Sequence, residues 1–214
     1  MKAKEVSKVL GLHITTKHTG KMTGMTSIST SCQLNSRCAK NAKVPGSVCA
    51  KCYAQRQMKM YRTMQPVMER NYRILTEDIM EDDAIPILHY AFVRIESFGD
   101  LANTTHAINY LKLIRKNPQT FFAWWTKNPD FIAKAFKKTG YKKPENVNII
   151  RSSMMINKPV KPGYWFIDGV FTAYTKEYAK ANNIEINCGN RKCFECRREY
   201  KKHDGIIYTN ELLK

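Results

Sequence analysis

The sequence lacks the features that would direct the chain into a membrane or a secretory route. Its basic N-terminal segment, residues 1–21, contains only the short apolar run Val9-Leu10-Gly11-Leu12, which falls far below a signal-peptide core or a membrane span. The cysteines of such a chain indicate a reducing compartment rather than secretion. We therefore expect a cytoplasmic protein with no membrane partner.

The signatures of several common enzyme classes are also missing. The five histidines show no metal-ligand spacing with one another. Neither a Ser/His/Asp arrangement nor a glycine-rich phosphate loop is present. These absences disfavour hydrolases and nucleotide kinases.

Acidic residues are scarce, because 18 Asp and Glu stand against 36 Lys and Arg, giving a formal net charge of +18. A field of that sign favours polyanions, so nucleic acid is an expected partner, and a generally basic, solvated surface is the alternative. The basic residues are spread over many segments, and no DNA- or RNA-binding motif stands out. The charge thus indicates a class of partner without locating its site.

The cysteines of the chain fall into two groups, and the spacing within each group is informative. A first cysteine group reads Cys32-x5-Cys38-x10-Cys49-x2-Cys52, with Asn, Ser, Lys, Pro and Gly between its members, a composition typical of a loop. Two cysteines separated by two residues can direct both sulfurs toward one centre, and thiolates bind zinc or iron–sulfur clusters. The loop over residues 32–52 is therefore predicted to bind metal, with buried thiols or a disulfide as the alternative.

A second cysteine group, Cys188-x4-Cys193-x2-Cys196, repeats the two-residue spacer. Its three thiolates leave one ligand missing. Cys32 is our preferred fourth ligand, because the ends of the first and last strands approach each other when a barrel curls, and His203 is the other candidate. The remaining cysteines of the first group would then hold a 4Fe-4S cluster with one open iron.

Strand-like and helix-like segments alternate along the chain. Such alternation predicts an α/β protein, a partial (open) β/α barrel of about six mostly parallel strands, formed as one domain by residues 1–214. Strands are expected within 21–31, 92–97, 120–126, 146–152, 163–174 and 184–188, and helices over 53–80 in two pieces near Pro66, 84–90, 104–116, 130–140 and 177–182.

Ligands of such folds sit beyond the carboxyl ends of the strands. Both cysteine groups are expected at that edge of the sheet. Lys127 and Arg151 also follow or end predicted strands, and their side chains are candidates for binding a carboxylate or a phosphate. Gly99-Asp100 is either part of this ligand site or a turn that closes a strand.

Several motifs resemble a known family. Cys49-Ala-Lys-Cys52-Tyr53-Ala54 resembles the end of the radical S-adenosylmethionine cysteine motif, although ten residues separate Cys38 from Cys49 where ordinary members have three. The runs Glu96-Ser-Phe-Gly-Asp-Leu101 and Phe121-Phe-Ala-Trp-Trp-Thr-Lys-Asn-Pro129 resemble phage-encoded radical-SAM-like iron–sulfur proteins of the gene product 88 family. With the cysteine motif, the resemblance extends over about residues 25–200.

This resemblance implies an enzyme in the host cytoplasm with one or two 4Fe-4S clusters and S-adenosylmethionine. Its partners would be a reductant such as flavodoxin or ferredoxin and a substrate such as nucleic acid or a nucleotide. The alternative is a non-catalytic protein in which zinc or a fully ligated cluster shapes a basic, nucleic-acid-binding surface. By the resemblance, the cluster ligands would be Cys38, Cys49 and Cys52, and the S-adenosylmethionine contacts would be Tyr53, Ser97, Gly99 and Asp100.

Overall fold

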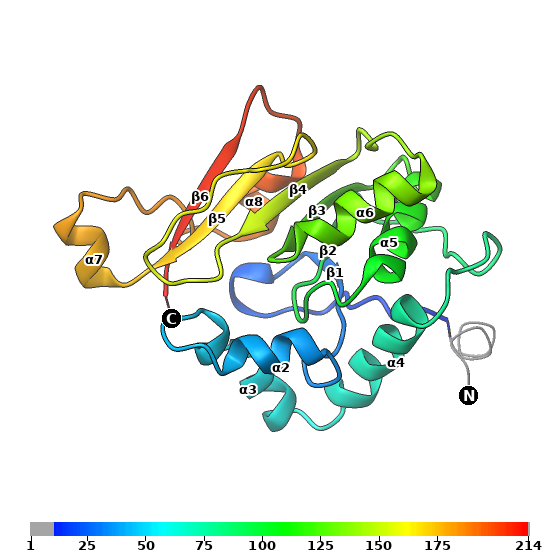
Figure 1. Ribbon diagram of the computed structural model, residues 1–214, viewed down its shortest axis with the longest axis horizontal. Helices are drawn as coiled ribbons and strands as arrows, with labels where there is room; N and C mark the ends of the chain where they lie inside the picture. Colours follow the sequence, from blue (N-terminus) through cyan, green and yellow to red (C-terminus); the bar gives the residue numbers. More distant parts are fainter. Residues whose placement is uncertain (1–10, 214) are drawn as a thin grey trace.

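The computed structural model describes residues 11–213 and contains a six-stranded sheet in which every pair of neighbouring strands is parallel. The strands follow one another in sequence order across the sheet, so β1 and β6 are its two edges (Figure 1). This confirms the predicted α/β fold with an open parallel sheet. The strands are β1 Thr26–Ile28, β2 Phe92–Ile95, β3 Phe121–Thr126, β4 Val147–Ser152, β5 Gly169–Tyr174 and β6 Ile207–Leu212.

Helices connect most of these strands, and local signals in the sequence set their ends. The Asn103 side chain accepts a hydrogen bond from His106 N at the start of α5, and Gly140 ends α6 in the left-handed conformation. No helix in the described part of the chain is long and apolar enough to cross a membrane. The helices are η1 Gly20–Met22, α2 Ser36–Ala42, η2 Cys49–Lys51, α3 Tyr53–Met60, α4 Met64–Thr76, α5 Thr104–Lys116, α6 Pro129–Thr139, α7 Lys176–Ala181, α8 Cys193–Cys196 and η3 Arg198–Tyr200.

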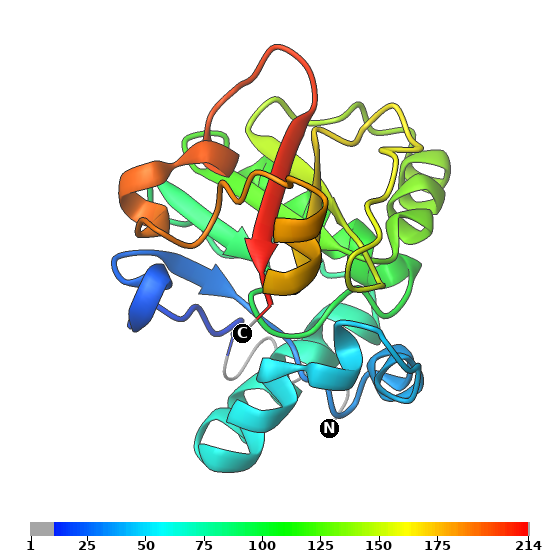
Figure 2. The same ribbon diagram turned by 90° about the vertical axis from the view of Figure 1, so that its left-hand side faces the viewer.

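Different helices and turns pack on the two faces of the sheet. Val93 and Ile95 of β2 point into the main hydrophobic core, which is formed with α4, α5 and α6. The residue between them, Arg94, points to the opposite side because successive side chains of a strand alternate. We call that side the inner face. Ser27, Arg94 and Ala123 lie side by side on it, because they are register partners on β1, β2 and β3. Figure 2 shows α8, η3 and η1 on this side of the sheet and α6 on the other.

Two predicted elements are absent. Residues 84–90 are irregular rather than helical, because Pro86 interrupts the segment and Asn117 of α5 binds its backbone, accepting from Leu88 N at 2.6 Å and donating to Pro86 O at 3.0 Å. Residues 184–188 are not a strand and contribute only an isolated bridge between Cys188 and Glu211. The last strand is instead β6, which the sequence analysis did not assign.

Other predicted boundaries need smaller corrections. The predicted first strand over 21–31 contains only the three residues of β1, preceded by η1. The helical run after Cys52 breaks at residues 61–63, before Pro66, which lies in the first turn of α4, where its missing N–H needs no partner. The long segment between β4 and β5 contains no helix and packs Phe166 and Ile167 into the main core.

Candidate metal centre

Four thiols face one cavity at the carboxyl edge of the sheet. The cavity measures about 40 Å³, and all members of the first cysteine group contribute to its lining. In Figure 1, the segment from α2 to α3 lies below the sheet, on the side toward which the arrows of β5 and β6 point. The lining residues are Cys32, Cys38, Asn41, Cys49, Cys52, Gln55, Gly99, Asp100, Lys127 and Asn128. We call this space the thiol pocket.

Local backbone structure positions each of these cysteines. Asn35 caps α2, which carries Cys38, by accepting from Arg37 N at 3.0 Å, and its amide donates to Asp100 O at 2.7 Å. This second bond fixes the start of α2 to the segment after β2. Cys49 and Cys52 are held by the 3-10 turn η2, in which Cys52 N donates to Cys49 O at 3.2 Å.

The position of Cys32 corrects a prediction. We expected its thiol to complete the second cysteine group, but it lines the thiol pocket and is close enough to Cys52 for the two thiols to shift each other's pKa. Its side chain is 1% exposed, and its Sγ lies 3.4 Å from Met58 Sδ in a small apolar cluster with Ala54 and Met68. Ala54 and Met58 of α3 pack against Cys32, and β1 and β6 are not paired in the sheet.

The thiol pocket contains the half-buried cation of Lys127. Burial acts to lower the pKa of Lys127, but Asp100 and the thiolates of Cys49, Cys38 and Cys52 outweigh it and raise that pKa. Lys127 therefore keeps its charge at neutral pH. Burial raises the pKa of Cys38 and Cys49, and the positive charge of Lys127 opposes this effect.

The thiols of Cys32 and Cys52 interact directly. The hydrogen bond between them raises the pKa of Cys32, and burial raises it further. The same hydrogen bond lowers the pKa of Cys52, because the thiol of Cys32 donates to the Cys52 thiolate. Cys52 is thus the member of the pair that ionises first, and a thiolate is the form of cysteine that binds metal.

The residues between β2 and α5 provide the wall beside the thiols. Gly99 and Asp100 line the thiol pocket, as the resemblance implied for a ligand site. The Asp100 carboxylate is buried and accepts from Thr126 Oγ1 at 2.6 Å and from Lys127 N at 3.0 Å. These bonds join the ends of β2 and β3, so Asp100 has a structural role whatever occupies the pocket.

Tyr53 and Ser97 lie beside the thiol pocket rather than in its lining. The Tyr53 hydroxyl donates to Ser97 O, and its ring contacts that of Phe98 at 5.6 Å between centroids. The Ser97 hydroxyl is buried and bonds Ser29 Oγ at 2.7 Å and Ser27 Oγ at 3.0 Å. Ser97 is therefore occupied by strand-to-strand contacts.

Arg151 does not belong to the thiol pocket. Its Nη1 donates to Lys161 O at 2.9 Å and to Pro162 O at 3.2 Å, in the long segment that precedes β5. Of the two basic residues predicted at strand ends, the structure thus brings Lys127 to the cysteines and gives Arg151 a role in holding a loop.

The second cysteine group lies near the β6 edge. Lys21 Nζ is 3.5 Å from Cys188 Sγ and forms an ion pair of 2.7 Å with Glu211 of β6. Burial raises the pKa of Cys188 and Cys193, and Lys21 acts against this at both thiols. Cys193 and Cys196 occupy the two ends of the short helix α8. The ring of His203 is exposed and hydrogen-bonded to Arg198 O.

In the described part of the chain, neither cysteine group is arranged as a closed metal site. Among residues 11–213, no three Cys, His, Asp or Glu side chains converge as the ligands of one metal ion. The chemistry of the donors nevertheless fits a thiolate-bound centre at the thiol pocket, because four cysteines face one cavity beside a half-buried cation that stabilises thiolates. The second group offers the same donor type around Lys21 and Glu211.

Sequence reasoning missed a buried polar cluster behind the thiol pocket. Glu96 accepts from Tyr110 Oη at 2.8 Å and from Thr30 Oγ1 at 3.0 Å, and His106 Nε2 lies 3.1 Å from its Oε1 without hydrogen-bond alignment. Glu96 also has a left-handed backbone, with φ at 58°. Its neighbour Gly99 is in van der Waals contact with this cluster. A carboxylate at the end of a predicted strand was the only signal that the sequence offered.

Replacement of Lys127 by Met is expected to slow alkylation of the metal-free first cysteine group at neutral pH. Without that cation the pKa of Cys38, Cys49 and Cys52 rises, and less of each thiol is ionised. Lys21→Met is the matched control, because Lys21 acts on Cys188 and Cys193 instead. Iodoacetamide labelling with peptide mass mapping measures both effects, and equal slowing of both groups by either variant would contradict the assignment.

Comparison with known proteins bears on the family named in the sequence analysis and not on its radical-SAM or iron–sulfur character. The model of the gene product 88 family matches residues 3–207, which include both cysteine groups, the strands β1 to β5 and only the first residue of β6. No curated protein and no solved structure matches the chain. Because the matched residues make up nearly the whole sequence, the chain belongs to the gene product 88 family.

Proposed function

We propose that this protein is an iron–sulfur protein whose first cluster occupies the thiol pocket. The observation that carries the proposal is the lining of that pocket, in which Cys32, Cys38, Cys49 and Cys52 surround one cavity next to Lys127. Four thiolates are the usual ligand set of 2Fe-2S and 4Fe-4S clusters. Such a cluster supplies one-electron transfer.

The surrounding residues suit a cluster of this kind. A thiolate-ligated cluster carries negative charge, and net charge, hydrogen bonds and solvent exposure tune its potential. Lys127 provides a compensating charge within the thiol pocket. Met58, Met68 and Ala54 are buried next to Cys32 and exclude water from that side of the pocket.

The position of Cys32 in the lining of the thiol pocket favours a cluster with four cysteine ligands. With all four cysteines as ligands no iron is left open, and the cluster serves electron transfer or structure. With Cys38, Cys49 and Cys52 alone, one iron is open to a substrate or cofactor. The contact between Cys32 and Cys52 supports the first arrangement.

A second candidate function, binding and reductive cleavage of S-adenosylmethionine, is favoured by the wall of the thiol pocket. Gly99 and Asp100 line the cavity that contains the thiols. Tyr53 follows Cys52 directly, and its hydroxyl is bound to Ser97 O at the end of β2. These are the positions at which the resemblance puts the methionine and adenine ends of that cofactor.

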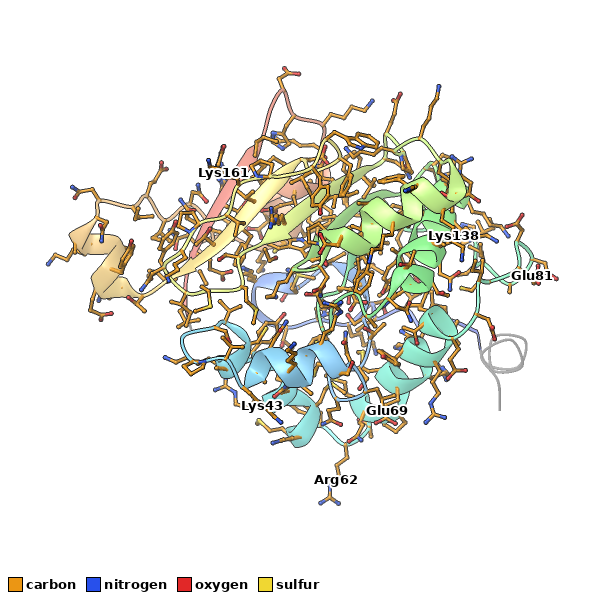
Figure 3. All side chains as sticks on the ribbon, in the orientation of Figure 1. Lys43, Arg62, Glu69, Glu81, Lys138 and Lys161 are labelled. Atoms are coloured by element: carbon orange, nitrogen blue, oxygen red, sulfur yellow. The ribbon has the colours of Figure 1, made fainter. Side chains whose placement is uncertain are left out.

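Nucleic acid remains a proposed partner without a located site. The basic side chains labelled in Figure 3 project from different regions: Lys43 after α2, Arg62 before α4, Lys138 in α6 and Lys161 in the segment before β5. The net charge of +18 supports binding of a polyanion by general electrostatic attraction. The arrangement of these four side chains supports no single groove.

Anaerobically prepared protein is expected to be brown and to contain iron together with inorganic sulfide. The reason is that the thiol pocket offers thiolate donors and a nearby cation to an iron–sulfur cluster. Iron, sulfide and zinc analysis on the same sample measures this directly. Stoichiometric zinc without sulfide would contradict the proposal and support the zinc-containing alternative.

The same sample separates the two candidate functions. If an iron is open, S-adenosylmethionine changes the electron paramagnetic resonance signal of the reduced protein and 5'-deoxyadenosine is released. If Cys32 completes the ligand set, the cluster forms but neither change occurs. Protein without added S-adenosylmethionine is the control for both measurements.

A further inference from the structure

The inner face of the sheet carries an arginine whose charge has no close counter-ion. Arg94 of β2 takes part in no ion pair with another described residue. Its Nε is buried and has no hydrogen-bond partner in the described part of the chain. Among residues 11–213, its other nitrogens have only the weak acceptor Met22 Sδ, 3.6 Å from Nη1.

The guanidinium is held in place by stacking. Its Cζ lies 4.5 Å from the centre of the Trp125 ring, and Phe171 contacts that ring edge-on at 5.0 Å between centroids. Trp125 lies on the same face because it follows Ala123, the register partner of Arg94, by two residues. The indole Nε1 of Trp125 is also buried without a hydrogen-bond partner in residues 11–213. Two buried donors without acceptors thus belong to one stacked pair.

Neighbouring charged groups do not neutralise Arg94. Lys21 is close enough for Arg94 to oppose its charge, so it adds positive character, and burial together with Arg94 lowers the pKa of His18. Burial acts to lower the pKa of Arg94, and Tyr53, Tyr200, Cys193 and Glu199 act to raise it, but Glu199 is outside ion-pair distance and accepts a hydrogen bond from Thr209 Oγ1 at 3.2 Å. Glu211 is paired with Lys21.

A buried donor without an acceptor opposes folding, and Arg94 Nε and Trp125 Nε1 are two such donors. Their presence on one stacked pair is explained if a ligand supplies the acceptors. Arginine presents a planar fork of N–H groups that matches carboxylate and phosphate oxygens. Cation–π stacking on Trp125 keeps this fork in place at little loss of side-chain entropy on binding.

We infer that Arg94 and Trp125 form a binding site for the carboxylate or phosphate group of a small-molecule ligand on the inner face of the sheet. The anion accepts from the Arg94 guanidinium and from Trp125 Nε1. This site is separate from the thiol pocket, since neither residue lines that cavity. The inference does not depend on a cluster being present.

The test compares the thermal stability of the protein in sodium phosphate, sodium acetate and sodium chloride at equal ionic strength and pH 7. Phosphate or acetate is expected to raise Tm by at least about 3 °C over chloride, since a ligand that binds only the folded state stabilises it. Isothermal titration with the same salts gives Kd. A rise with phosphate alone identifies a phosphoryl ligand, and a rise with acetate alone identifies a carboxylate. No rise with either anion would overturn the inference.

Two variants locate the effect. Arg94→Met removes the charge, so the anion-dependent rise in Tm disappears while Tm in chloride stays the same or increases. Trp125→Phe keeps a stacking ring but removes the indole N–H, so Kd rises about tenfold while folding is retained. Arg115→Met is the matched control, because Arg115 stacks on Tyr141 at 4.2 Å on another surface and is exposed. An anion-dependent rise in Arg94→Met equal to that of the unchanged protein would show binding to surface lysines and overturn the site.

Discussion

Serine in place of Cys32 is expected to remove as much iron from the protein as serine in place of Cys49. Both residues line the thiol pocket, where Cys32 is close enough to Cys52 for the two thiols to shift each other's pKa. Serine is a poor ligand for an iron–sulfur cluster, so the loss amounts to one whole cluster, about four iron atoms if it is of the 4Fe-4S type. Iron and sulfide per chain, measured on anaerobically prepared variants, give the result.

Double variants decide which cysteine group Cys32 serves. If Cys32 and Cys49 hold the same cluster, the Cys32→Ser/Cys49→Ser protein loses no more iron than Cys49→Ser alone, because the two changes act on one site. Cys32→Ser/Cys188→Ser then loses the iron of both groups. The reverse pattern, in which Cys32→Ser adds to Cys49→Ser but not to Cys188→Ser, would contradict the position of Cys32 in the thiol pocket.

A third outcome of this series bears on the open iron. If Cys32→Ser retains its iron while Cys38→Ser and Cys49→Ser lose theirs, the cluster needs only three thiolates and Cys32 is a buried neighbour. The apolar contacts of Cys32 with Met58 and Met68 allow such a structural role. That result would favour binding of S-adenosylmethionine over a fully ligated cluster.

Elements defined by local signals were predictable from the sequence. The helix over 104–116 has an asparagine cap before it and Asn117-Pro118 after it, and the structure reproduces its bounds. The apolar run before Asn128-Pro129 forms β3, and Pro129 begins α6. Most of the parallel sheet follows from this alternation, because parallel neighbours require crossovers of such length.

Elements defined by distant partners were not predictable. Residues 84–90 look helical by composition. Two distant asparagines bind the backbone there instead: Asn109 of α5 accepts from Met80 N before the segment, and Asn117, which follows α5, accepts from Leu88 N within it. The predicted strand over 184–188 fails for a similar reason, since Asn187 binds Tyr208 O and Asn210 N of β6 through its side chain. β6 itself is specified by its pairing with β5.

The candidate site was likewise predictable only where its features depend on residues that are close in the sequence. The spacing within each cysteine group is local, so the sequence identified the thiols and placed both groups near strand ends. Which cysteines lie next to Cys32 depends on how distant parts of the chain pack, and no residue near Cys32 in the sequence specifies that packing. Arg94 was not predicted to have a functional role. Its lack of a counter-ion depends on the residues that pack beside it from β3 and from the segment carrying η3, which are distant in the sequence.

Alanine in place of Gly99 is expected to be the most destabilising conservative substitution beside the thiol pocket. An added Cβ would lie 2.5 Å from Thr30 Oγ1, 2.6 Å from Glu96 Oε2 and 2.8 Å from Thr30 O. Gly99 also has φ at +86°, in the left-handed region. Left-handed strain of about 1–2 kcal/mol and overpacking of about 1–3 kcal/mol sum to roughly 2–5 kcal/mol.

Part of this loss arises because the neighbours of Gly99 cannot move freely. Thr30 O is backbone, and the Glu96 carboxylate is fixed by Tyr110 and Thr30. For a chain of this size each kcal/mol lowers Tm by about 2–4 °C, so a decrease of roughly 5–15 °C is expected. Chemical denaturation and thermal melting of the metal-free protein measure it without interference from the cluster.

Gly140→Ala is the matched control for Gly99→Ala. Gly140 ends α6 with φ at +67°, but an added Cβ there would meet no atom within 4 Å. This variant therefore carries the backbone strain alone, about 1–2 kcal/mol. The difference between the two variants measures the close approach of Thr30 and Glu96 to Gly99. Equal losses of stability would contradict that packing and would leave Gly99 as an ordinary turn residue at the edge of the thiol pocket.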